Sequence, residues 1–222
     1  CNHLLIFIGT FLGVLLSLYL KNYQHNRRVR ERLHIALENI ISEIKENSKK
    51  TEIHLQKATY QLGAIDMIRP LINEKDSLLG TEVQVNKMIK EYPDFFSAKK
   101  RTPAGNGLYY WDASLNLNFD YLDLSDIAWR NAQAMDVLHL VDFKTANELY
   151  SLYNLQYQVL TDVKKAIDIL KEIPVGNNND ESSIQLILQD YQRQLRIARD
   201  FEKGLSEYYM QILQQLNKKD FD

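Results

Sequence analysis

The sequence predicts an all-α protein in which an N-terminal transmembrane helix continues into a long helix and packs in an antiparallel helical bundle. Three observations lead to this fold. The segment Leu4–Leu20 carries no charge. Several long stretches space their apolar residues three or four positions apart, as packed helices do. The chain has only 4 Pro and 8 Gly in 222 residues, which favours long helices over turn-rich β structure.

The uncharged segment predicts a retained transmembrane anchor over residues 1–22, followed by a bundle domain over residues 23–222. At about 1.5 Å per residue, Leu4–Leu20 covers roughly 25 Å, at the short end for a hydrocarbon core of about 30 Å. A signal-peptide core is the alternative, and the lack of an A-x-A-like cleavage site disfavours it.

A basic run flanks the predicted anchor, and the lipid bilayer is therefore a predicted partner. Basic residues after a span indicate a cytoplasmic side for the following domain and can bind anionic head groups. Basic residues before the span would reverse this orientation, so the side of the membrane stays open. The flank consists of Lys21, Arg27, Arg28, Arg30 and Arg32.

The first long helix is expected from about Tyr23 to Ile68, ending before Pro70. Its predicted buried seam is polar near Asn47 and Thr51 and consists of Leu33, Leu37, Ile40, Ile44, Thr51, Leu55, Ala58, Leu62 and Ile65. Thr81 and Gln84 have the spacing of a capping box, which predicts a short helix to about Glu91.

The segment 95–122 is expected to form a small irregular or β-hairpin insertion. Lys99–Arg101 leads into Thr-Pro-Ala-Gly-Asn-Gly, whose composition is typical of a loop. Residues 114–121 alternate polar and apolar side chains, the period of a half-buried strand. Residues 71–80 fit no single pattern.

Three further helices are expected in the C-terminal half. Asp123 or Ser125 can cap a short helix through Met135, and Asp142 can cap a helix to about Glu172. The predicted seam of the latter is Ala146, Leu149, Tyr153, Tyr157, Leu160, Ile167 and Leu170. Ser182 and Gln185 predict another capping box, before a coiled-coil-like helix whose seam is interrupted at Glu202.

The sequence gives no specific sign of catalysis, a metal or a cofactor, and the chain is predicted not to be an enzyme. Glu31 and His34 form one Glu-x-x-His unit, whereas a di-iron bundle site needs two such units and two further carboxylates. His139 with Asp136 is the nearest second candidate. His25, His34, His54 and His139 lack metal-ligand spacing and are expected at the surface or the seam edge. A net charge of -2 argues against nucleic-acid binding.

The aromatic residues Tyr109, Tyr110 and Trp111 are a candidate partner surface. The favoured interpretation is that they cap the end of the bundle and belong to the core, since aromatic side chains gain much from burial.

Two stretches of the chain resemble a bacterial family of unknown function. One runs from Gly9-Thr-Phe-Leu-Gly13 through the Asn- and Arg-rich residues 20–28 to residues 37–47. The other runs from Leu124 through Trp129 to the Leu-Tyr pairs that end at Tyr153. The family's usual Trp in the exit motif is Tyr23 here. The resemblance implies an anchored helical domain in the bacterial inner (cytoplasmic) membrane, with no known activity.

The sequence therefore predicts a single-pass, membrane-anchored helical interaction or scaffold protein without catalytic activity. A protein partner or self-association is expected, because seam surface near the anchor can pair two chains. The alternatives are a sensor-type helical domain and, less favoured, a metalloenzyme using Glu31, His34 and His139.

Overall fold

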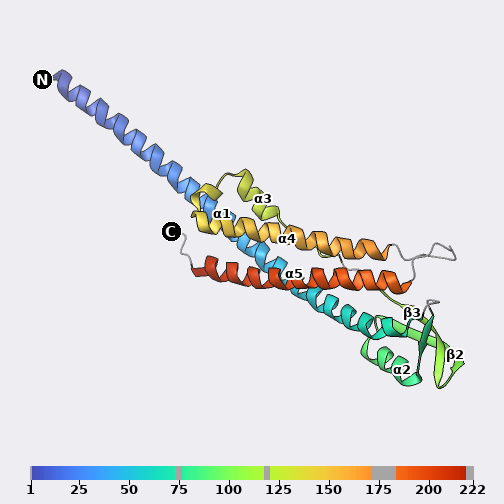
Figure 1. The fold of residues 1–222 in the computed structure, drawn as a ribbon. Helices are drawn as coiled ribbons and strands as arrows, with labels where there is room; N and C mark the ends of the chain where they lie inside the picture. The colour runs from blue at the N-terminus through green and yellow to red at the C-terminus, as the bar shows by residue number, and fades with distance from the viewer. Residues whose placement is uncertain (1, 74–76, 118–120, 172–183, 219–222) are drawn as a thin grey trace.

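The computed structural model describes residues 2–73, 77–117, 121–171 and 184–218, with the backbone alone for residues 2–10 and 218. Figure 1 shows a long helix crossing a helical hairpin, with a small sheet at one end. The described elements are helices α1 (Asn2–Ile68), α2 (Glu82–Glu91), α3 (Ile127–Ala134), α4 (Phe143–Leu170) and α5 (Ile184–Lys218), 3-10 turns η1 (Arg69–Leu71) and η2 (Leu138–Leu140), and strands β1 (Leu78–Gly80), β2 (Phe96–Gly105) and β3 (Leu108–Leu115).

The bundle consists of α1, α4 and α5. Helix α5 runs antiparallel to α1, because His54 and Gln61 contact Glu202 and Tyr191 in reversed order along the chain. Helices α4 and α5 form an antiparallel hairpin (Figure 1). The predicted helix end near Pro70 is confirmed, since α1 stops at Ile68 and Pro70 follows within η1.

The predicted seams of α1 and α5 are largely confirmed, whereas the seam of α4 needs one correction. Leu37, Ile40 and Ile44 are at most 1% exposed. Tyr157, expected in the α4 seam, is 74% exposed, and the neighbouring Gln156 is buried in its place. The helix is rotated in this way because Gln156 hydrogen-bonds polar groups inside the bundle.

The prediction of an all-α fold is wrong, because the described residues include a three-stranded antiparallel sheet and the arrangement is mixed α/β. The strand order is β1-β3-β2. Leu78 pairs with Trp111, and Phe96 pairs with Leu115. The sheet and α2 form a head at the C-terminal end of α1 (Figure 1). A hairpin does occur within 95–122, but its strands are residues 96–105 and 108–115 rather than the alternating residues 114–121.

The hairpin turn explains why composition was misleading here. Gly105 pairs with Leu108, so Asn106 and Gly107 form a two-residue loop. Both have positive φ, 50° at Asn106 and 74° at Gly107, as a type I′ turn requires. The Asn-Gly pair is therefore a hairpin signal, and the preceding residues of the apparent loop belong to β2.

Helix starts follow the predicted caps in most cases. Thr81 and Gln84 form the predicted capping box of α2, and the Asp142 carboxylate accepts from the Thr145 backbone N–H at 3.1 Å at the start of α4. Asp126, rather than Asp123 or Ser125, is the N-cap residue of α3. The proposed cap at Ser182 lies outside the described residues.

The transmembrane prediction is also corrected. No helix formed by the described residues is long and apolar enough to cross a bilayer. The predicted anchor over residues 1–22, the single-pass topology and the inner-membrane location are therefore wrong for this structure. The physical reason lies in length: the side chains that the structure describes begin at Phe11, so the uncharged run among them is Phe11–Leu20, about half of the roughly 20 residues that a span needs. The helix itself continues without a break from residue 2 to residue 68.

Candidate binding surfaces

The candidate partner surface of Tyr109, Tyr110 and Trp111 lies on β3, the central strand of the head. The Arg101 guanidinium carbon lies 4.5 Å from the Tyr109 ring centre and 5.6 Å from that of Trp111. The Trp111 indole N–H donates to the Gly80 carbonyl at 3.1 Å. Tyr109 and Trp111 are thus engaged within the head, and Tyr110, 46% exposed, has the most accessible of the three rings.

Strand β2 forms one edge of the sheet but is protected against the addition of a further strand. A bulge interrupts its register between Ala98 and Lys100, and Pro103 removes a backbone donor. Arg101 forms a 2.6 Å ion pair with Glu82 of α2, and this hydrogen bond raises the pKa of Arg101. Bulges, cations and proline are the usual protections of an exposed edge, so this strand is a poor docking site for another strand.

A polar cluster joins α1 and α4 to the start of α3. The Glu43 carboxylate accepts hydrogen bonds from the Ser125 hydroxyl at 2.6 Å, the Ala128 backbone N–H at 2.9 Å and the Tyr153 hydroxyl at 2.7 Å. The Asn47 side chain binds both the N–H and the carbonyl of Ser125. Glu43 therefore holds the N-terminus of α3 against the bundle.

The aromatic side of this cluster is buried, whereas Glu43 and Ser125 are half-buried. The Trp129 and Tyr153 rings stack at 5.0 Å with an interplanar angle of 9°. Burial, and then the hydrogen bond to Glu43, raise the pKa of Tyr153 well above its usual range. The Tyr209 hydroxyl donates to Gln156 at 2.7 Å. The two stretches that carry the family resemblance meet here, one supplying Glu43 and the other the aromatic pair.

A second polar contact lies between α1 and α5. His54 Nδ1 is 2.9 Å from Glu202 Oε2, and the Glu202 side chain is fully buried. The other oxygen, Oε1, and the hydroxyl of Thr51 are buried without a hydrogen-bond partner in the structure. The residue that interrupts the apolar seam of α5 is thus a buried carboxylate, Glu202, that contacts a histidine. The side chain of that histidine, His54, is only 12% exposed.

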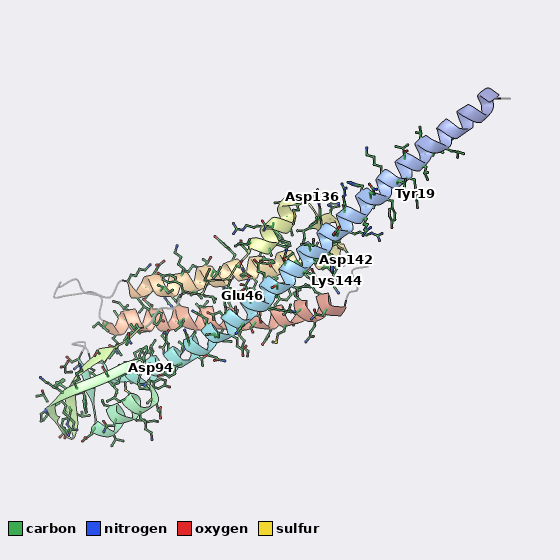
Figure 2. All side chains as sticks on the ribbon, turned by 180° about the vertical axis from the view of Figure 1, so that it is seen from behind. Tyr19, Glu46, Asp94, Asp136, Asp142 and Lys144 are labelled. Carbon is green, nitrogen blue, oxygen red and sulfur yellow. The ribbon has the colours of Figure 1, made fainter. Side chains whose placement is uncertain are left out.

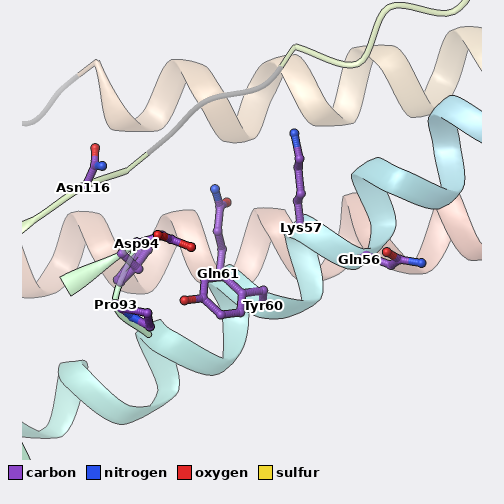
Figure 3. Close-up of a pocket in the computed structure, with 8 residues that line it drawn as sticks. Gln56, Lys57, Tyr60, Gln61, Pro93, Asp94 and Asn116 are labelled. Atoms are coloured by element: carbon purple, nitrogen blue, oxygen red, sulfur yellow. The ribbon is translucent and has the colours of Figure 1, made fainter. Parts of the chain in front are cut away.

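A cleft with a volume of about 660 Å³ lies between α1 and the head. Figure 3 shows Lys57 and Gln61 pointing from α1 towards the coil that carries Asn116, just after β3, with Asp94 on the turn before β2. A backbone hydrogen bond joins two segments of the cleft wall, since the Asn116 backbone N–H donates to the Phe95 carbonyl at 2.8 Å. A neighbouring cleft of about 560 Å³ lies between the sheet and α5, where Tyr110 and Leu188 line it.

The N-terminal part of α1 projects beyond the bundle (Figures 1 and 2). We name residues 11–32 the arm. Leu12, Leu16 and Tyr19 are 58%, 60% and 68% exposed, and Tyr23 is 59% exposed. Figure 2 places Tyr19 on this projecting part and Asp94 at the opposite end of the molecule. The basic residues are also exposed on the arm: Lys21, Arg27, Arg28, Arg30 and Arg32.

The candidate metal ligands are not brought together. The two candidate histidines each lie close to an acidic residue on their own segment instead: His34 lies 3.3 Å from Glu38, and His139 lies 3.7 Å from Asp136. Among the residues that the structure describes, no group of three or more His, Cys, Asp or Glu side chains could hold a metal ion.

Comparison with known protein families, with curated proteins and with solved structures finds no match to this chain. The resemblance to a bacterial family of unknown function therefore stays a prediction, and the function must be argued from the surfaces themselves.

Proposed function

We propose that the protein is a helical interaction module without catalytic activity, and that its arm pairs with the arm of a second copy. The observation that carries this proposal is the register of α1. Positions 12, 16, 19 and 23 alternate steps of four and three, and the same steps continue through 26, 30 and 33 to Leu37, Ile40 and Ile44. This heptad spacing is typical of helices that pair along one seam.

The seam is covered in the bundle and uncovered in the arm. Leu37, Ile40 and Ile44 are at most 1% exposed, whereas Leu12, Leu16, Tyr19 and Tyr23 are more than half exposed. Removing apolar surface from water is favourable by about 25 cal/mol for each Å². The seam of the arm is apolar at these four positions and polar at Asn26 and Arg30. An exposed apolar patch rimmed by polar residues is typical of an interaction site. A second arm supplies the same spacing and therefore fits this seam.

Substitutions in the arm test this proposal through the mass of the particle in solution. We expect light scattering to give twice the mass of one chain for the wild type. Leu16→Asp together with Tyr19→Asp is expected to give one chain, because a charge in a paired seam is buried without a partner. The control is Leu186→Asp on α5, since Leu186 is 57% exposed and away from the arm. A single-chain mass for the wild type at every concentration would contradict the proposal.

A sensor-type domain is the second candidate function, and the cleft beside α1 favours it. The cleft lies on the helix that also forms the arm, so a ligand there contacts the element that would pair. A ligand that binds the folded state raises the melting temperature. A ligand screen in which no compound shifts the melting temperature would count against this candidate.

A further inference from the structure

The cleft between α1 and the head has walls that are fixed before any ligand arrives. On α1, the Gln61 side-chain oxygen accepts a hydrogen bond from the Tyr191 hydroxyl at 2.9 Å. The centres of the Tyr60 and Tyr92 rings lie 5.1 Å apart. On the head, the backbone N–H groups of Phe95 and Phe96 donate to the Tyr92 carbonyl. These contacts fix the backbone of both walls, and a site whose walls need not rearrange loses less free energy on binding.

The lining offers side-chain amides from two directions. Gln56 comes from α1, and Asn116 comes from the coil that follows β3 (Figure 3). A side-chain amide has one carbonyl acceptor and an NH₂ donor, the same pair of functions that a peptide group presents. Amides on both walls therefore match a ligand that carries a series of peptide groups.

The lining also carries one charge of each sign, from Lys57 and Asp94. Burial, and then the charge of Asp94, raise the pKa of Tyr60, which agrees with the position of this carboxylate beside the ring. A polyanion would meet Asp94 as well as Lys57, so a ligand with both an acidic and a basic group fits better.

The cleft is open, because Gln56, Lys57, Asp94 and Asn116 are all exposed. Sites for small molecules usually bury 70–90% of the ligand surface. An extended peptide whose two ends lie outside the cleft does not need to be enclosed in this way. We propose that this cleft binds an extended peptide segment of a partner protein, with its backbone on the amides and an acidic and a basic side chain facing Lys57 and Asp94.

The proposal concerns the opposite end of α1 from the arm, so it does not depend on self-association. The experiment pans the full chain against a phage library of random seven-residue peptides. Enriched peptides are then synthesised, and their Kd is measured by calorimetry on the wild type and on variants. We expect the enriched peptides to share one acidic and one basic residue.

The variants separate this cleft from other surfaces. Gln56→Ala with Asn116→Ala is expected to weaken binding about tenfold, as two lost hydrogen bonds predict. When the panning is repeated with Lys57→Glu, the enriched peptides are expected to carry a basic residue where those selected on the wild type carry the acidic one. Gln214→Ala, an exposed amide on α5, is the matched control and is expected to leave Kd unchanged. Both amides of the test variant are exposed, so folding is retained, and circular dichroism checks this.

Three results would overturn the proposal. The first is a library in which no peptide is enriched over a resin without protein. The second is a set of peptides that bind the Gln56→Ala, Asn116→Ala variant as tightly as the wild type. Displacement of the peptides by equimolar free lysine or glutamate would also overturn it, since the site would then recognise a single amino acid.

Discussion

Replacing His54 by Leu should destabilise the bundle strongly, because it leaves a buried carboxylate without its donor. Glu202 is fully buried, and its Oε2 lies 2.9 Å from His54 Nδ1. Its Oε1 has no hydrogen-bond partner in the structure, so His54→Leu removes the contact that stabilises this group. Breaking a buried pair by removing one partner costs about 3–5 kcal/mol. Against a total stability of about 5–15 kcal/mol, such a loss is readily measured.

The assay is urea unfolding followed by circular dichroism at 222 nm, with the free energy of unfolding extrapolated to water. The double variant His54→Leu, Glu202→Leu removes both polar groups and is expected to recover most of the lost stability, because replacing a buried pair by apolar residues is often neutral or favourable. The control is His34→Leu. His34 pairs with Glu38 on the surface of the same helix, where such pairs contribute about 0–1 kcal/mol.

A loss below about 0.5 kcal/mol for His54→Leu would refute this reasoning, since that is the range of surface substitutions. Additive effects in the double-mutant cycle would refute it too, because two groups in contact must show a coupling energy.

Three further predictions concern other parts of the structure. Glu43→Ala removes two hydrogen bonds at the start of α3 and a third from Tyr153 of α4, and is expected to cost about 2–3 kcal/mol, with faster hydrogen exchange at Ala128; unchanged exchange there would contradict the role of Glu43. Burial raises the pKa of Tyr153 and Tyr191 above the unfolded value of about 10, so stability is complete below that pH and falls as pH rises above it. Absorbance at 295 nm should then show these tyrosines ionising only as the chain unfolds, whereas one transition near pH 10 for all 13 tyrosines would be inconsistent with their burial. Gly107→Ala should cost about 1 kcal/mol through its positive φ, while Gly204→Ala in helix α5 should stabilise by a similar amount, and thermal melts that reverse this order would disprove the type I′ assignment.

The helices could be predicted from the sequence because their signals are local. Apolar spacing predicts the buried face of α1, and the pair Thr81 and Gln84 predicts the start of α2, since both depend only on neighbours along one helix. Tyr157 is the informative exception in α4. The choice between Tyr157 and Gln156 as the buried residue depends on partners far away in the chain, among them Asn47 and Tyr209.

The hairpin was expected but its strands were placed at the wrong residues, and the third strand was missed because its pairing is not local. Strand β1 is only three residues long, and its partner Trp111 lies about thirty positions later. The Asn106-Gly107 pair was the available signal, and the composition around it indicated a loop instead. The buried pair of His54 and Glu202 could not be predicted for the same reason. Neither residue gives a signal in the sequence by itself, and the two come into contact only because α1 packs against α5.

Hydrogen exchange of the arm tests most directly whether α1 pairs with a second copy. A helical segment without tertiary contacts is marginal in water, so its amides should exchange quickly unless another chain covers it. Mass spectrometry of exchange over residues 11–32 is therefore carried out at low and at high protein concentration, with the buried part of α1 around Ile40 as the internal reference. The account predicts protection of the arm that rises with concentration while the reference stays constant. Fast exchange of the arm at every concentration would contradict it.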